Sequence, residues 1–206
     1  MGVGMGWSGW ADHCKRICEF TLLHGAAVFV TWFVIYPLQS AVLGARLTEA
    51  LFLVPVLLFL PTVIKALAAW MYGWWAVLYI LPTALVQHLM LDLPLDAAQL
   101  SKLVVYLVSA PLVRSCLANM GLDINASRGL HTWRFLIFIV LLSSIMLAAA
   151  FLILYAPDLS IREAGLFLAL FVLGDIAGSA FVLLILVLVF RFREGRFRAA
   201  RMRREA

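Results

Sequence analysis

The fold class follows from a long apolar run near the end of the chain, residues 164–190, AGLFLALFVLGDIAGSAFVLLILVLVF, which contains one charged residue, Asp175. A helix needs about 20 apolar residues to cross a bilayer, so this run is long enough. Similar runs recur at about 17–38, 47–72, 74–91, 99–119 and 131–155. We therefore predict an all-α, polytopic bundle of about six transmembrane helices.

The composition agrees with a membrane protein and excludes a soluble one. Of the 206 residues, 65% are hydrophobic and 13% are charged, which leaves too little polar surface for a soluble domain. The net charge is +5, but the basic residues gather beside the apolar runs and at the end of the chain. That placement is typical of membrane topology and not of a nucleic-acid-binding face. We expect a lipid bilayer as the surroundings and no nucleic acid as a partner.

Lysine and arginine lie mainly on one side of the six predicted spans. That side holds Lys15, Arg16, Arg128, Arg134 and seven tail arginines, whereas the other side holds Arg46, Lys102 and Arg162. Positively charged loops stay in the cytoplasm. We therefore predict a multi-pass membrane protein with both termini in the cytoplasm.

The chain divides into a membrane domain, predicted over 1–190, and a basic cytoplasmic tail, predicted over 191–206. The tail arginines are Arg191, Arg193, Arg196, Arg198, Arg201, Arg203 and Arg204. Each basic residue near an anionic leaflet contributes about 1 kcal/mol of binding. We expect the tail or the cytoplasmic loops to contact lipid or a protein partner, with a plain topology anchor as the alternative.

Two prolines, Pro55 and Pro61, interrupt the second predicted span. Each proline removes a backbone hydrogen bond, so we predict that this helix is broken at Pro61. A helix that restarts there presents unpaired N–H groups and the positive end of its dipole. The stretch from Pro61 to Lys65 is therefore a candidate site for an anionic or carbonyl-bearing ligand. Alternatively, Lys65 extends its ammonium group to the cytoplasmic interface.

Asp175 lies about eleven residues into the sixth span, roughly 16 Å deep at about 1.5 Å per residue. A charged group near the membrane centre is costly, so we expect Asp175 to face the bundle interior. There it either finds a partner, with Lys65 as the candidate, or stays protonated. Gly174 and Gly178 flank it in a G-x-x-x-G pattern that predicts close helix packing. Asp175 is either a ligand or coupling residue, or a structural contact between helices.

Three further polar residues complete the candidate site: His24, His88 and Arg114. His24 and His88 lie within the first and third spans, where they can line the same cavity or hydrogen-bond between helices. Arg114 lies near the cytoplasmic end of the fourth span, where a topology anchor is the alternative to a ligand contact.

No catalytic motif occurs. Intramembrane aspartyl proteases need two aspartates, and no predicted span except the sixth contains one. Serine nucleophile motifs and glycine-rich phosphate loops are missing from the sequence. His13, Cys14 and Cys18 match no established zinc spacing. We predict a protein that is not an enzyme and has no cofactor and no metal.

Two segments resemble a known family. The stretch FLPTVIKALAAWMYGWWAVLYILPTAL, 59–85, and the stretch LGDIAGSAFVLLILVLVFR, 173–191, are similar to parts of the MASE1 membrane sensory domain. The matching residues are Pro61, Gly73, Gly174, Asp175 and Gly178. The glycine that usually follows the family's proline is Thr62 here, and the spans number about six where the family has eight.

The resemblance implies a stand-alone sensory or ligand-binding module in a bacterial inner membrane, and this module acts through a separate partner. We expect Asp175, Lys65 and the proline-broken span to form its polar site, with a small-molecule ligand. Two alternatives stay open. One is a transport component resembling the substrate-binding subunits of energy-coupling-factor importers, and the other is an accessory subunit of a membrane complex.

Overall fold

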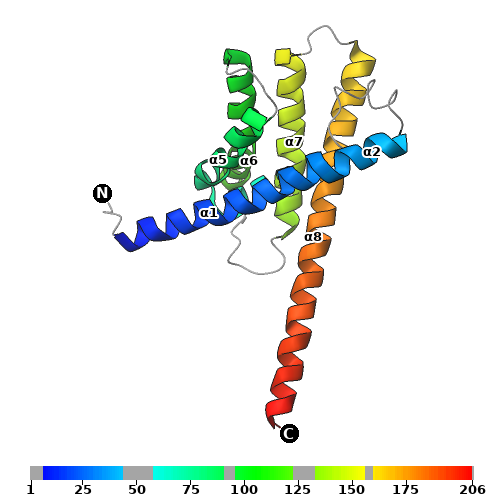
Figure 1. The fold of residues 1–206 in the computed structure, drawn as a ribbon. Helices are drawn as coiled ribbons and strands as arrows, with labels where there is room; N and C mark the ends of the chain where they lie inside the picture. Colours follow the sequence, from blue (N-terminus) through cyan, green and yellow to red (C-terminus); the bar gives the residue numbers. More distant parts are fainter. Residues whose placement is uncertain (1–6, 44–57, 91–95, 123–132, 156–159, 206) are drawn as a thin grey trace.

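The computed structural model describes residues 7–43, 58–90, 96–122, 133–155 and 160–205, and these ranges are almost entirely helical. The elements are α1 (Trp7–Val30), η1 (Thr31–Ile35), α2 (Tyr36–Leu43), α4 (Pro61–Tyr72), α5 (Trp75–Met90), α6 (Ala97–Asn119), α7 (Trp133–Tyr155) and α8 (Ile161–Glu205). They form a helical bundle from which α8 projects (Figure 1). Among the described residues there is no β-strand, so the all-α prediction is confirmed.

Four helices in these ranges are long and apolar enough to cross a membrane: Trp10–Ala41, Ala97–Asn119, Phe135–Leu154 and Ile161–Leu188. α5 is a shorter apolar helix. Large apolar side chains such as Leu22, Ile153 and Leu184 are exposed on these helices. A soluble surface rarely carries so many of them, so a lipid bilayer is the surroundings that suits this protein. The count of six spans stays a prediction.

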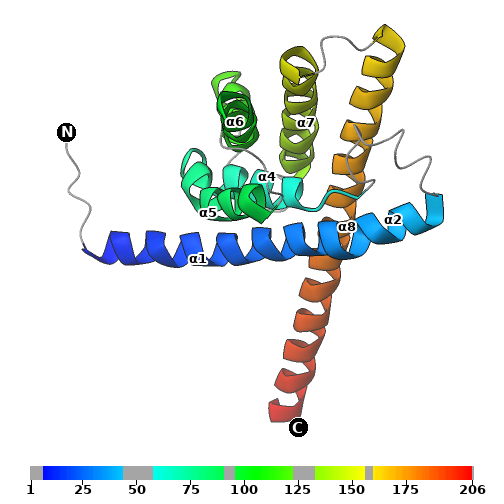
Figure 2. The ribbon, with the colours of Figure 1, turned by 45° about the horizontal axis from the view of Figure 1, so that its top comes forward.

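α1, η1 and α2 form one continuous rod that crosses α7 and α8 steeply, as Figures 1 and 2 both show. The rod begins at Trp7, about ten residues before the predicted first span. Contacts with α5 hold its first turns, because His13 stacks on Trp75 with 4.2 Å between ring centroids and hydrogen-bonds to the hydroxyl of Tyr79 at 2.7 Å. These turns pack on α5 although they are too polar to extend the hydropathy run.

α4 is the central helix and packs against α1, α5, α6, α7 and α8. Its 12 residues extend only about 18 Å, and most of its side chains are buried. Pro61 is the first helical residue, a position where its missing N–H costs nothing. Residues 58–60 are not helical. Pro55 and residues 44–57 lie outside the described part, so the predicted break stays a prediction.

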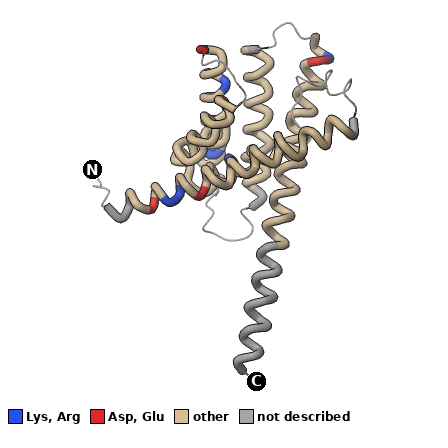
Figure 3. The backbone as a smooth tube through the Cα atoms, in the orientation of Figure 1, with Lys and Arg blue, Asp and Glu red and all other residues tan. Residues whose placement is uncertain are grey.

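α8 continues without interruption to Glu205, through the stretch predicted as a separate tail. The side chains beyond Leu188, including all seven tail arginines, lie outside the described residues. Figure 3 shows described charged residues on the first half of α1, at one end of the bundle and, for a few basic ones, within the bundle. α6 and α7 begin and end within two residues of the predicted fourth and fifth spans.

Candidate functional site

Asp175 lies inside the bundle with no exposed surface. Its Oδ1 accepts a hydrogen bond from the Thr62 hydroxyl at 2.9 Å, and its Oδ2 accepts one from the Ser144 hydroxyl at 2.5 Å. A buried carboxyl group is stable only when its oxygens are hydrogen-bonded, and here both are. The carboxyl group thereby joins α4, α7 and α8. It also lies beside the first turn of α4, where the helix dipole favours negative charge.

Lys65 is also buried, with 1% of its surface exposed. Its Nζ donates to the Ser109 hydroxyl at 2.9 Å and lies 4.1 Å from the centroid of the Tyr106 ring, a cation–π contact. The alternative that Lys65 extends to the cytoplasmic interface is therefore wrong. The ammonium group stays inside because α6 supplies both a hydroxyl and an aromatic face.

Lys65 and Asp175 lie near each other but do not form a direct ion pair. The described part of the chain contains no Lys65–Asp175 contact within 4.0 Å, although the two groups are close enough to interact electrostatically. Thr62 and Lys65 are three residues apart and share one face of α4. That face therefore carries one contact to Asp175 and one contact to α6.

Tyr106 extends this polar network to α1. Its hydroxyl lies 2.7 Å from Nε2 of His24, which is fully buried. Ser109 donates to the Tyr106 carbonyl oxygen at 3.0 Å, so the two residues that hold Lys65 also contact each other. Nδ1 of His24 is buried and has no hydrogen-bond partner among the described residues. We call Asp175, Thr62, Ser144, Lys65, Ser109, Tyr106 and His24 the polar network.

The segment that leads into α4 is held from two sides through its backbone. The N–H of Phe59 donates to the carbonyl oxygen of Gly174 at 3.2 Å, and the N–H of Leu60 donates to the Thr31 hydroxyl at 3.4 Å. A Cβ atom added to Gly178 would lie 2.5 Å from the Phe59 carbonyl oxygen. The segment that packs closely on the G-x-x-x-G pattern is therefore the non-helical backbone at Phe59. Thr31 opens the π-helical turn η1, a type of irregularity frequent at functional sites.

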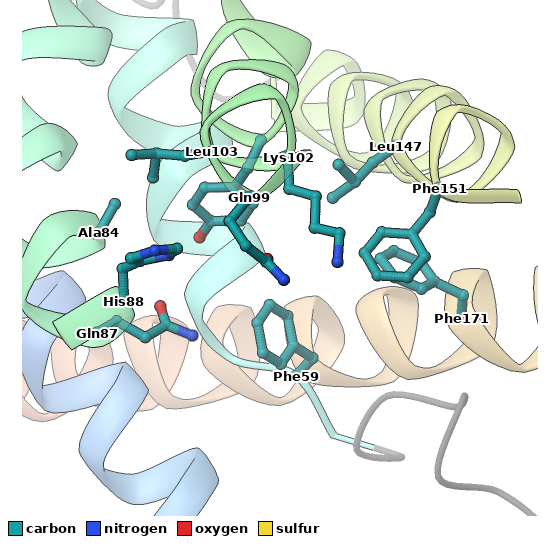
Figure 4. A pocket seen from close by; sticks show the side chains of 11 residues that line it. Phe59, Ala84, Gln87, His88, Gln99, Lys102, Leu103, Leu147, Phe151 and Phe171 are labelled. Atoms are coloured by element: carbon teal, nitrogen blue, oxygen red, sulfur yellow. The ribbon is translucent and has the colours of Figure 1, made fainter. Parts of the chain in front are cut away.

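A pocket of about 200 Å³ opens beside the polar network. α5, α6, α7 and α8 surround it, together with Phe59. Its lining consists of Phe59, Ala84, Gln87, His88, Gln99, Lys102, Leu103, Tyr106, Leu147, Phe151 and Phe171. Figure 4 shows Gln87 and His88 on one side and Gln99 and Lys102 on the other, with the rings of Phe151 and Phe171 near Lys102. Nζ of Lys102 lies 5.1 Å from the centroid of the Phe151 ring.

Phe59 and Tyr106 connect the pocket with the rest of the site, because both line the pocket and both are bonded elsewhere. Phe59 is bonded to Gly174 through its N–H, and Tyr106 is bonded to His24 through its hydroxyl. Displacement of Phe59 would therefore disturb its bond to α8, and displacement of Tyr106 would disturb its bond to α1.

The structure brings most of the predicted site residues into one region and leaves one apart. Asp175, Lys65 and His24 belong to the polar network, Pro61 starts α4 beside it, and His88 lines the pocket. Arg114 instead lies at the other end of α4, where its Nε donates to the Trp70 carbonyl oxygen at 3.2 Å. This bond satisfies a backbone oxygen that the end of the helix leaves unpaired.

Sequence reasoning missed Thr62, Ser144, Ser109 and Tyr106, whose hydroxyl or aromatic groups hold the charged residues. Only Thr62 had a signal, its position directly after Pro61. Chemically, the arrangement is a set of fixed hydrogen bonds next to a pocket with aromatic walls. Comparisons of the chain with family models, with curated proteins and with solved structures find no match.

Proposed function

We propose that the protein is a stand-alone membrane sensory module, similar to the MASE1 domain, that binds a small ligand in the pocket. It acts through a separate protein partner in a bacterial inner membrane, with both termini in the cytoplasm. One observation supports this most directly: Phe59 and Tyr106 belong both to the pocket wall and to the bonds that hold α8 and α1. A ligand that moves either side chain directly disturbs the bond that this residue makes to α8 or to α1.

The path from pocket to partner runs through α8. Gly174 accepts the bond from Phe59, and the next residue, Asp175, holds α4 and α7. α8 then continues as one helix to Glu205. Because a helix transmits a shift or rotation along its length, a change at Gly174 and Asp175 moves the C-terminal end of α8. A ligand produces such a change only by binding one arrangement of these contacts better than another.

The test is a pair of matched substitutions, Asp175→Asn in the polar network and Asp12→Asn on the exposed surface of α1. The full chain is extracted from its native membrane after chemical crosslinking, and the attached proteins are identified and quantified by mass spectrometry. We expect Asp175→Asn to change the amount of the attached partner by on the order of fivefold or more, the lower range of measured couplings between sites. Asp12→Asn should leave that amount unchanged.

Equal partner amounts for both variants and the unchanged protein would count against a sensory role of Asp175. An attached ATPase module that persists in both variants would favour the transport alternative over the sensor. Expression of both variants in the membrane is the control for folding.

A further inference from the structure

The size of the pocket limits what it can hold. Its volume is about 200 Å³. An apolar cavity of about 150 Å³ is large enough to bind benzene. The pocket therefore has room for one aromatic ring with a small substituent, and it cannot enclose a full acyl chain.

The walls of the pocket are suited to an aromatic ring. Four of the lining side chains are aromatic: Phe59, Tyr106, Phe151 and Phe171. They come from the segment before α4, from α6, from α7 and from α8. Figure 4 shows the ring of Phe59 apart from the neighbouring rings of Phe151 and Phe171. Aromatic groups prefer offset or edge-to-face contacts with other rings, which such walls provide.

The polar groups of the pocket are suited to an anion. Eleven residues line it, and none of these described residues is Asp or Glu. Lys102 supplies a positive charge, and the amide of Gln99, one turn earlier on α6, lies beside it (Figure 4). Gln87 and His88 face them from the last turn of α5. Lys102 and the two amide groups provide donors, and a carboxylate is a strong acceptor for donors of this kind.

We infer that the ligand of this pocket is a small aromatic carboxylate, bound by Lys102 and Gln99 at its carboxylate and by Phe59, Phe151 and Phe171 at its ring. This inference rests on the proposed function in one respect, because it takes this pocket to be the site at which the sensory module binds its ligand. The ring contacts Phe59, the residue whose N–H is bonded to Gly174 of α8.

The test uses 4-fluorobenzoate as the probe and the purified full chain in a mild detergent. Binding is followed by fluorine NMR as saturable broadening of the probe signal. We expect Lys102→Gln to weaken binding about tenfold or more, the loss of one hydrogen bond to a charged group. Lys102→Arg, which keeps the charge, should restore most of the affinity. The neutral probe 4-fluorobenzamide should bind more weakly to the unchanged protein and equally to the unchanged protein and Lys102→Gln.

Lys15→Gln is the matched control, because Lys15 lies on α1 with 71% of its side chain exposed and is not part of the pocket lining. It removes the same charge and should not alter the affinity for 4-fluorobenzoate. Palmitate offers the same carboxylate on an acyl chain and should not displace the probe.

Three results would overturn the inference: no saturable binding of 4-fluorobenzoate, equal weakening by Lys102→Gln and Lys15→Gln, or displacement by palmitate. The comparison of the two probes on the unchanged protein decides the matter even if Lys102→Gln does not fold. These results are independent of the partner measurement with Asp175→Asn. If 4-fluorobenzoate does not bind but Asp175→Asn changes the amount of attached partner, only the proposed ligand class is wrong. If the probe binds as expected but Asp175→Asn has no effect, only the proposed signalling role is wrong.

Discussion

Thr62 on α4 donates a hydrogen bond of 2.9 Å to Asp175 on α8, across 113 positions of sequence. At the other end of the same short helix, Arg114 on α6 donates to the carbonyl oxygen of Trp70. α4 is thus held at both ends by side chains from longer helices. A central helix held in this way has few positions available to it.

The two hydroxyl partners of Asp175 predict a graded effect on stability. Asp175→Ala leaves the buried hydroxyls of Thr62 and Ser144 without their acceptor, at a cost of about 1–3 kcal/mol for each. Asp175→Asn keeps one oxygen acceptor and should cost about 1 kcal/mol. The measurement is the free energy of unfolding in mixed micelles with increasing SDS. Equal values for Asp175→Ala and Asp175→Asn would mean that these bonds do not stabilise the bundle.

Gly178 should not tolerate even one added methyl group. Its Cβ would lie 2.5 Å from the Phe59 carbonyl oxygen, so Gly178→Ala forces the backbone before α4 away from α8. We expect a loss of about 1–3 kcal/mol in the free energy of unfolding. Gly165→Ala on the same helix is the control, since nothing lies within 4 Å of the new atom. It should stabilise the protein by about 0.5–1 kcal/mol because alanine favours the helix more than glycine does.

The bond between His24 and Tyr106 can be measured by a double-mutant cycle. Tyr106→Phe removes the hydroxyl but keeps the ring beneath Lys65. The single substitution should cost about 1 kcal/mol, and it should cost much less in a chain that already carries His24→Phe. The free energies of unfolding of the two single variants and the double variant give the coupling. Additive effects would show that the 2.7 Å contact is not a stabilising bond.

The positions of several helices could be predicted because their apolar runs end at polar segments. The predicted limits of 99–119 and 131–155 are close to those of α6 and α7. The start of α1 could not be predicted, because its polar first turns are held by tertiary contacts of His13 with Trp75 and Tyr79. The steep crossing of α1 over α7 and α8 likewise leaves no signal in hydropathy.

The burial of Asp175 could be predicted from the cost of a charge in lipid. Its partners could not, because the rotation of each helix about its axis decides which hydroxyl faces the carboxyl group. Ser144 and Ser109 are ordinary residues of apolar helices until that rotation is known. Lys102 was predicted only as an outer-side charge, and its place in the pocket depends on α6 and α7 being neighbours.

The predicted topology determines from which side a ligand reaches the pocket. Cys14, Cys18 and Cys116 are exposed and fall on the predicted cytoplasmic side. Lys102 and Arg162 fall on the outer side, and Figure 1 places the beginnings of α6 and α8 at one end of the bundle. In intact cells, a thiol reagent that cannot cross membranes should leave the native cysteines unlabelled. It should label Arg162→Cys in a chain whose native cysteines are replaced by serine. Labelling of Cys116 without labelling at position 162 would show that the topology is opposite to the predicted one. The pocket would then take its ligand from the cytoplasm.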